Sequence, residues 1–385
     1  MKILVLTFYY KPDLSAGSFR TTAFVDELKK LVDKDTQIEV ITTLPNRYHS
    51  FERKALASEI VGNVTIRRIK LPVHKSGMLD QSRAFMMYAF EVLRIIRSNE
   101  YDLVFATSGR LFTAFLGALV ARKTKAKLYL DIRDIFTDTL KNVLKNRFLK
   151  LLIPVFLQLE KFTIRSASRV NLVSQGFLGY FKIVAENQNF SFFPNGIDSE
   201  FLDYDFRKPG STSKEIILYA GNIGEGQGLE KIVPGCAQAL SDCEFWIVGD
   251  GGARLKLESA LQQLNVSNVR LLDPVGRVDL LRLYTQCDYL FLHLNDYSAF
   301  EKVLPSKVFE YASTGKPVIA GVSGYARDFI ENNVKGSVVF DPCSVDGFIQ
   351  AFKALPKTMV QRDEFIEKYQ RQNIARKMAE ELLLI

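Results

Sequence analysis

Three segments in the second half of the chain each pair an apolar run with a glycine-containing turn or a helix start. They are Tyr219 to Val233 (YAGNIGEGQGLEKIV), Phe245 to Glu258 (FWIVGDGGARLKLE) and Leu304 to Val322 (LPSKVFEYASTGKPVIAGV). In a parallel α/β sheet such turns lie at the carboxyl ends of strands, where ligands bind. Helix starts there offer unpaired N–H groups and the positive end of the helix dipole, which suit a phosphate. Together the three segments predict a site for a small molecule that carries a diphosphate.

The first half offers two weaker candidates. A loop from Tyr9 to Ser18 contains Pro12 and Gly17 and precedes a helical pattern, so it is either an anion cradle or an ordinary strand-to-helix loop. Asp131, Arg133 and Asp134 end a strand-like run. Charged groups at such a position are costly to bury unless they have partners or a chemical role. The triplet is therefore either functional or a structural ion pair.

Other chemistries lack their motifs. The glycines of Gly221–Gly226 follow the spacing G-x-x-G-x-G, and Glu244 precedes the next strand, so a nicotinamide-binding fingerprint is absent. No G-x-S-x-G sequence suggests a hydrolase. His49, His74 and His293 stand alone, and we predict no metal site and no cofactor. No motif for nucleic-acid binding is present.

The chain length and the alternation of patterns predict the elements that position these residues. At 385 residues with 47% hydrophobic content, the chain should fold into two domains. Strand-like runs alternate with helical patterns, which predicts two doubly wound, parallel, Rossmann-like sheets facing a cleft. We expect a first domain over 1–194 and a second over 195–364. One amphipathic helix over 365–385 should pack back on the first. The expected strands are 2–10, 37–44, 64–71, 102–107, 126–134, 168–174, 215–221, 245–250, 269–273, 289–294, 317–322 and 337–341, and the expected helices are 18–32, 83–98, 110–122, 145–166, 228–240, 252–264, 278–286, 306–314, 325–332 and 344–355.

The charge is distributed unevenly. Residues 1–195 hold 30 Lys and Arg against 17 Asp and Glu, a balance of +13, and residues 196–385 hold 21 against 26, a balance of −5. An anionic partner of the first half is expected. Segment 141–165 mixes basic and apolar residues, which fits either a helix in a lipid headgroup layer or a buried helix. The apolar run 85–90, flanked by Arg83 and Arg94, is a second candidate for the membrane surface, but we predict that it belongs to the core. No uncharged apolar stretch reaches the 18 residues that a spanning helix needs.

These motifs resemble glycosyltransferase family 4, the retaining nucleotide-sugar transferases with the two-domain GT-B architecture. Within the family, the resemblance is to bacterial transferases of the WbuB type, which are associated with transfer of N-acetyl-L-fucosamine in O-antigen assembly. It rests on the segments YYKPDLSAGSFR, VITTLPNRY, LYLDIRD, VSQGF, FPNGID, YAGNIGEGQGLEKI, IVGDG, PSKVFEYASTGKPVIAG and RQNIARKM.

The resemblance implies that a nucleotide sugar lies between the domains and that Glu310 binds its ribose. The family has a second glutamate eight residues earlier, where this chain has Lys302. Asn222 and Gln227 stand where the family has the arginine and lysine that bind the diphosphate, so Lys307 is expected to supply a replacement cation. The expected donor-binding residues are Gly17, Asn222, Gln227, Gly249, Val275, Leu304, Pro305, Ser306, Lys307 and Glu310.

The resemblance further implies that the reaction retains the anomeric configuration. No metal is needed if Lys307 and the backbone amides of Leu304 to Ser306 stabilise the leaving diphosphate. Asp134 or Asp131 would handle the acceptor, and Arg20 or Arg133 could add charge from the first domain. The expected catalytic residues are Asp131, Arg133, Asp134 and Lys307. The substrates would be a UDP-sugar and a lipid-diphosphate-linked saccharide. The enzyme would then be cytoplasmic and peripheral, on the anionic inner face of the cell membrane. The alternative is a nucleotide-binding scaffold at the membrane with little or no catalytic activity.

Overall fold

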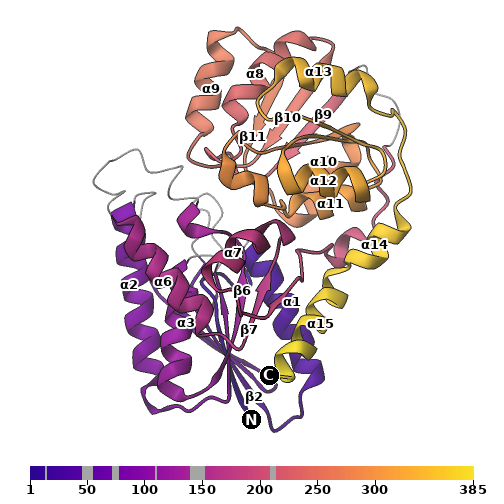
Figure 1. Cartoon of the computed structure of the whole chain (residues 1–385). Coiled ribbons are helices and arrows are strands. Elements are labelled where there is room, and N and C mark those ends of the chain that lie inside the picture. Colours follow the sequence, from indigo (N-terminus) through magenta and orange to yellow (C-terminus); the bar gives the residue numbers. More distant parts are fainter. Residues whose placement is uncertain (14, 46–54, 72–77, 109–110, 139–151, 209–213) are drawn as a thin grey trace. The chain divides into compact units, whose positions relative to one another are not determined.

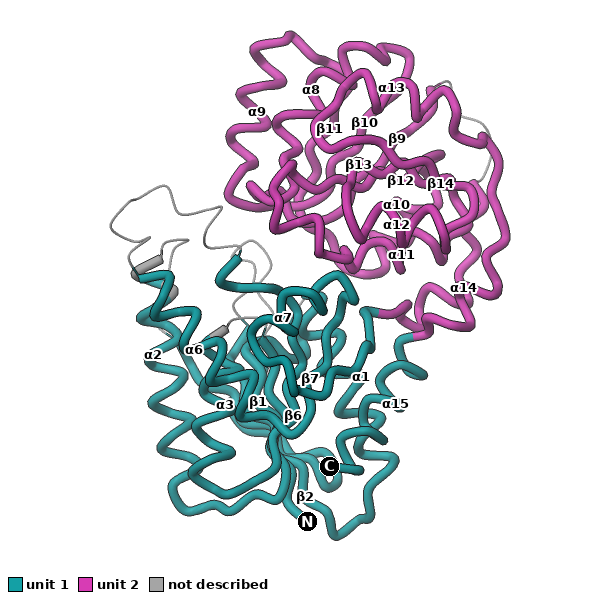
Figure 2. The backbone as a smooth tube through the Cα atoms, viewed as in Figure 1, with its two compact units in different colours: residues 1–195, 371–385 teal, residues 196–370 magenta. Residues whose placement is uncertain are grey.

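The computed structural model describes residues 1–13, 15–45, 55–71, 78–108, 111–138, 152–208 and 214–385 (Figure 1). The chain forms two compact units. The first contains residues 1–195 and 371–385, and the second contains residues 196–370 (Figure 2). The carboxyl-terminal segment therefore returns to the first unit.

The described part of the first unit contains an eight-stranded sheet in the order β3-β4-β2-β1-β5-β6-β7-β8. Adjacent strands are parallel except β3 and β4. The strand order reverses between β1 and β5, which is the point where ligands bind in such sheets. The strands are β1 Lys2–Leu6, β2 Gln37–Thr43, β3 Ser58–Val61, β4 Val64–Ile69, β5 Leu103–Thr107, β6 Lys127–Ile132, β7 Arg169–Leu172 and β8 Phe190–Ser191.

Helices flank this sheet because their apolar faces cover its buried strands. The carboxyl-terminal helix packs against α1, and its Met378, Ala379 and Leu382 join the core formed by β1 and α1. Figure 1 shows the two helices side by side. The helices of the unit are α1 Ala16–Leu31, α2 Met78–Ile95, η1 Ile96–Ser98, α3 Leu111–Thr124, α6 Ile153–Arg165, η2 Gln175–Phe177, α7 Leu178–Val184 and α15 Arg371–Leu383.

The second unit contains a six-stranded parallel sheet in the order β11-β10-β9-β12-β13-β14. The strand order reverses between β9 and β12, which places the carboxyl ends of these two strands at the ligand-binding point. The strands are β9 Glu215–Ala220, β10 Cys243–Val248, β11 Val269–Leu272, β12 Tyr289–His293, β13 Val318–Gly321 and β14 Ser337–Phe340. The helices are η3 Ser199–Phe201, α8 Leu229–Ala239, α9 Arg254–Gln263, α10 Arg277–Gln286, η4 Ser298–Lys302, α11 Lys307–Ser313, α12 Gly324–Asn333, α13 Val345–Ala354 and α14 Asp363–Tyr369.

The predicted fold class of two parallel α/β sheets is confirmed. Two sequence predictions differ from the structure, and a third is largely untested. The single helix over 365–385 is two helices, α14 and α15, separated at Gln370, whose backbone is extended at ψ 125°. Met86, Met87 and Phe90 of the expected core run 85–90 are exposed. Most of the basic part of segment 141–165 lies outside the described residues, and α6 covers the rest. In the described part of the chain, no helix is long and apolar enough to cross a membrane.

Candidate functional site

The carboxyl edge of the second sheet gathers the glycine-rich turns that the sequence singled out. The turn after β9 runs from Gly221 to Gly228, and the turn after β10 from Gly249 to Gly252. Their backbones touch, since a Cβ at Gly249 would lie 1.8 Å from the Gly221 carbonyl oxygen. With φ at +143°, Gly249 also has a backbone conformation that other residues rarely adopt. Both conditions require glycine, so the two turns are built to approach each other.

Asn222 and Gln227 lie together in the first of these turns. The Asn222 amide donates to Gln227 Oε1 at 2.8 Å, and the Gly224 N–H donates to the same oxygen at 3.3 Å. Both side chains are neutral, so the turn offers hydrogen bonds to a phosphate without cancelling its charge.

Glu310 is the centre of a charged cluster on the same edge. Lys307 Nζ lies 2.6 Å from Glu310 Oε2, and Arg277 Nη1 lies 3.5 Å from Glu310 Oε1. Arg277 also forms an ion pair with Asp198, and the Tyr284 hydroxyl donates to Glu310 Oε2 at 3.3 Å. The Glu310 side chain is only 8% exposed, so its two cations compensate the burial of its carboxylate and fix its orientation.

This cluster changes the expectation for Lys307. Lys307 is not a bare cation, because it pairs with Glu310 and also donates to Tyr284 at 3.2 Å. Arg277 is a second cation that the sequence analysis missed. Its partner Asp198 is 79 positions away, so no local spacing pattern could have revealed the pair. The cluster contains two cations and two carboxylates, so its formal net charge is zero.

The remaining expected donor-binding residues of this unit come after β11 and β12 in the chain. Val275 follows β11, and the segment from Leu304 to Ser306 joins η4 to α11. Leu304 is buried, and Val275, Pro305 and Ser306 are half-buried. Because the carboxyl ends of parallel strands share one edge, these residues lie on the same side of the sheet as Gly249, and their place in one donor site stays a prediction.

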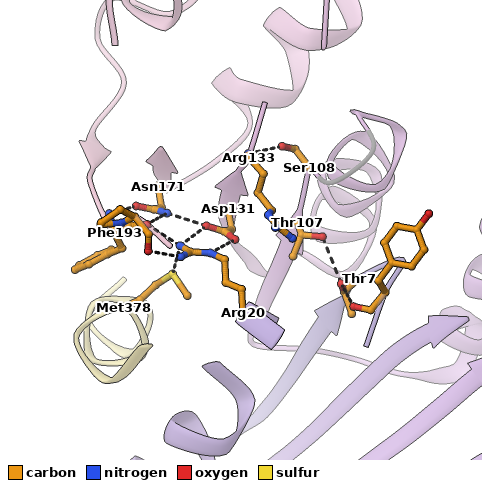
Figure 3. Close-up of polar contacts among 11 residues, drawn as sticks. Thr7, Arg20, Thr107, Ser108, Asp131, Arg133, Asn171, Phe193 and Met378 are labelled. Carbon is orange, nitrogen blue, oxygen red and sulfur yellow. Dashed lines mark hydrogen bonds and ion pairs between the residues drawn. The ribbon is translucent and has the colours of Figure 1, made fainter. Parts of the chain in front are cut away.

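In the first unit, Asp131 and Arg20 form a buried ion pair (Figure 3). Arg20 Nε and Nη2 each lie 2.8 Å from a different Asp131 oxygen, and the Asn171 amide donates to Asp131 Oδ1 at 2.7 Å. Arg20 also donates to the carbonyls of Phe193 and Pro194. Burial would raise the pKa of Asp131, but Arg20 holds it below its usual value. Because both side chains are almost fully buried and their groups are occupied, this geometry favours a structural ion pair.

Arg133 lies two residues further on, against the amino end of α1. A Cβ at Gly17 would lie 2.4 Å from Arg133 Nη1, so a larger residue there would have to displace the guanidinium. Its Nε atom is buried and has no hydrogen-bond partner among the described residues. Burial lowers the pKa of Arg133 to about 10, so the side chain is still a cation at neutral pH. The structure thus brings Gly17 and Arg133 together, in the first unit, and a cation beside a helix amino end leaves a position suited to an anion.

Asp134 differs from Asp131 in both partners and pKa. Its Oδ1 atom is buried, with no hydrogen-bond partner in the described part of the chain. Burial raises the pKa of Asp134 to about 6, Arg133 opposes the rise, and Glu160 adds to it. A carboxylate that titrates near neutral pH is suited to accept a proton.

No cluster of three or more His, Cys, Asp or Glu side chains is placed to hold a metal ion within the described ranges. A metal-independent reaction stays a prediction. Two of the three histidines, His49 and His74, lie outside the described residues. His293 is buried at the end of β12.

Comparisons with known proteins identify relatives of this chain. Residues 203–372 match the family described as "Glycosyl transferases group 1". The chain is 25% identical to "Putative colanic acid biosynthesis glycosyl transferase WcaI" of Escherichia coli (strain K12), over 99% of this chain and all of that protein. Among solved structures, sucrose-phosphate synthase from Thermosynechococcus elongatus is similar with a TM-score of 0.74 at 13% identity, covering 99% of this chain and 98% of the other. Anabaena Alr3699/HepE, solved in complex with UDP and glucose, has a TM-score of 0.71 at 16% identity, covering all of both chains. At these identities the solved structures establish the shared two-unit fold.

Proposed function

Since residues 203–372 match the family described as "Glycosyl transferases group 1", we propose that the chain is a retaining glycosyltransferase. It moves a sugar from a UDP-sugar to a lipid-diphosphate-linked saccharide in the synthesis of a bacterial surface polysaccharide. The observation that carries the proposal is that the family match covers the unit whose sheet edge gathers the glycine turns and Glu310. The colanic acid role in the name of the Escherichia coli relative supports the polysaccharide. The UDP in the Anabaena structure supports the donor.

The donor binds to the second unit in this proposal. Glu310 accepts hydrogen bonds from the ribose hydroxyls, and its ion pairs with Arg277 and Lys307 fix its direction. Lys307 has three N–H donors, of which Glu310 and Tyr284 take two, so one is left for the diphosphate. When the nucleoside diphosphate leaves, negative charge develops on its β-phosphate. Preorganised donors from Lys307 and the turn amides of Asn222 and Gln227 lower that barrier. The donor sugar is N-acetyl-L-fucosamine or a related amino sugar, as the resemblance to the WbuB-type transferases implies.

Nucleotide-sugar stabilisation tests the donor assignment. A ligand that binds only the folded state raises the melting temperature in proportion to its affinity and concentration. Within a panel of UDP-, GDP-, ADP- and dTDP-sugars, UDP-sugars should stabilise the protein most. A larger shift with another nucleotide would replace UDP in the proposal.

Asp134 is the proposed acceptor base, because Asp131 is occupied by Arg20 and Asn171. Asp134→Asn should lower kcat by about 10²- to 10⁴-fold, the usual contribution of general base catalysis. The wild-type rate should fall as the pH drops below about 6, because protonated Asp134 cannot accept a proton. Steady-state kinetics between pH 5 and 8 measure both effects, and UDP affinity of the variant is the control. Full activity of Asp134→Asn would assign the proton to another acceptor, such as the leaving phosphate.

The first unit is proposed to dock on the anionic inner face of the cell membrane. Its α2 exposes Met86 (71%), Phe90 (66%) and Leu93 (39%) at positions i, i+4 and i+7, which form one helix face. Arg83 and Arg94 on the same helix are exposed too. An apolar face with basic neighbours fits an anionic lipid surface, as does the +13 balance of residues 1–195.

Vesicle binding tests this surface. The protein should bind vesicles that contain phosphatidylglycerol at low salt and leave them as salt rises, because the Debye length shrinks to about 8 Å at physiological ionic strength. Met86→Ser with Phe90→Ser should weaken binding more than tenfold, since each buried apolar side chain contributes about 1.5–3 kcal/mol. Ile183→Ser with Leu255→Ser is the matched control, because both residues are exposed on other helices. Equal loss in the two double variants would rule out α2 as the docking face.

A further inference from the structure

The end of β12 holds the glycine turn after β9 by three successive carbonyl groups. The Asn295 amide donates to the Glu225 carbonyl at 2.7 Å, and the Asn295 backbone N–H donates to the Gly226 carbonyl at 2.9 Å. His293 Nδ1 lies 2.6 Å from the Gln227 carbonyl oxygen. Three consecutive peptide groups of the turn are therefore tied to one strand end.

The partners of His293 define its protonation state. A carbonyl oxygen can only accept, so Nδ1 carries the proton and donates to Gln227. Nε2 accepts from the Cys343 N–H at 2.9 Å and is therefore unprotonated. His293 is a neutral ring with one tautomer, and burial lowers its pKa to about 4. The donor to Gln227 is thus present throughout the neutral range.

The partners of Asn295 fix the direction of its amide. Its Oδ1 atom accepts from Lys231 Nζ at 2.9 Å and from the Asp296 N–H at 3.0 Å. The amide nitrogen is left to face Glu225. The turn also fits closely around this side chain, since a Cβ at Gly228 would lie 2.9 Å from Asn295 Cγ.

A turn of this composition needs such support. Four of the eight residues from Gly221 to Gly228 are glycine. Glycine loses more conformational freedom on ordering than any other residue. If the turn were free before binding, the ligand would have to supply that ordering free energy, and preorganisation removes the cost.

We infer that His293 and Asn295 are positioning residues that hold the turn from Gly221 to Gly228 in its donor-binding conformation. The inference rests on the proposed function, because the turn is assigned there to the donor diphosphate. β9 and β12 are hydrogen-bonded neighbours at the point where the strand order reverses, so the end of one strand supports the ligand turn of the other.

Two variants of His293 separate positioning from packing. Asn has almost the shape of Leu and leaves the same void when it replaces histidine, but only Asn offers a donor near the position of Nδ1. His293→Leu should raise the Kd for UDP and the KM for the UDP-sugar by about threefold to tenfold, as expected for one lost hydrogen bond. His293→Asn should recover most of that loss. The KM for the acceptor should not change.

Asn295→Asp is a second, independent test of the positioning role. It keeps the oxygen that binds Lys231 and removes the donor to Glu225. Circular dichroism establishes that each variant is folded, and isothermal titration with UDP gives the affinities. We expect a weaker affinity for UDP in this variant as well.

Equal Kd values for UDP in the wild type, His293→Leu and Asn295→Asp would overturn the positioning role and leave the proposed function intact. Equal losses of UDP affinity in His293→Leu and His293→Asn would also overturn the role of His293, because the loss would then come from the void that both substitutions leave. If the wild-type protein binds no UDP, the proposed function fails, and the inference fails with it.

Discussion

Arg20→Met is expected to lower the free energy of unfolding of the first unit by about 3–5 kcal/mol, the cost of breaking a buried ion pair by removing one partner. Arg20 and Asp131 are 3% and 0% exposed, so Asp131 would be left as an uncompensated charge in the core. The variant would also lose the hydrogen bonds from Arg20 to the Phe193 and Pro194 carbonyls, which join α1 to the segment after β8.

Denaturant unfolding followed by circular dichroism measures the loss. Trp246, the only tryptophan, lies on β10 in the second unit, so its fluorescence reports the other unit as an internal control. Removing both charges in Arg20→Met with Asp131→Leu should recover much of the loss. Unfolding of Arg20→Met at the wild-type denaturant concentration would contradict a structural role for the pair and return Asp131 to the catalytic candidates.

Glu310→Gln is expected to weaken UDP binding by about 1.5–3 kcal/mol, the range for a hydrogen bond to a charged group. This corresponds to a Kd about 10- to 150-fold higher. Gln keeps the shape of Glu310 but loses the charge that pairs with Lys307 and Arg277, so the direction of the side chain is lost as well.

Isothermal titration with UDP measures this effect, and the control is Glu331→Gln. Glu331 is an exposed carboxylate on α12 of the same unit, and its ion pair with Arg327 is at the surface. We expect wild-type affinity in the control. Wild-type affinity in a folded Glu310→Gln variant would remove Glu310 from the ribose site.

The strands and helices near these residues could be predicted from the sequence because their signals are local. β1 and β9 are short apolar runs, and the turns after β9 and β10 contain the glycines that their close approach requires. The edge strand β3 was missed, since its four residues are mostly exposed and have no apolar pattern. Amino-acid composition also does not show which apolar helix faces are covered by other parts of the fold. For this reason the exposed residues of α2 were assigned to the core.

The partners of the site residues could not be predicted, because they depend on contacts between distant parts of the chain. Arg277 reaches Asp198 and Glu310 from the start of α10, and nothing in the sequence around it marks these contacts. His293 and Asn295 bind backbone carbonyls, which exist at every position and leave no trace in residue types. The choice between Asp131 and Asp134 likewise required the position of Arg20, 111 residues from Asp131.

The neutral side chains of Asn222 and Gln227 also fit the alternative of a nucleotide-binding scaffold. The resemblance implies cations at these two positions, and Lys307 is already paired with Glu310. A protein with this arrangement could hold a nucleotide without cleaving its sugar. Binding alone therefore does not separate the two functions, and turnover does.

Release of UDP from a panel of UDP-sugars, measured with and without a membrane extract as the source of acceptor, tests the central claim most directly. The account predicts that the wild-type protein releases UDP slowly from one UDP-sugar alone and faster when the extract is present. The Glu310→Gln variant should be far slower in both conditions. A wild-type protein that binds UDP but releases none from any UDP-sugar, even with the extract, would contradict the enzyme and favour the scaffold.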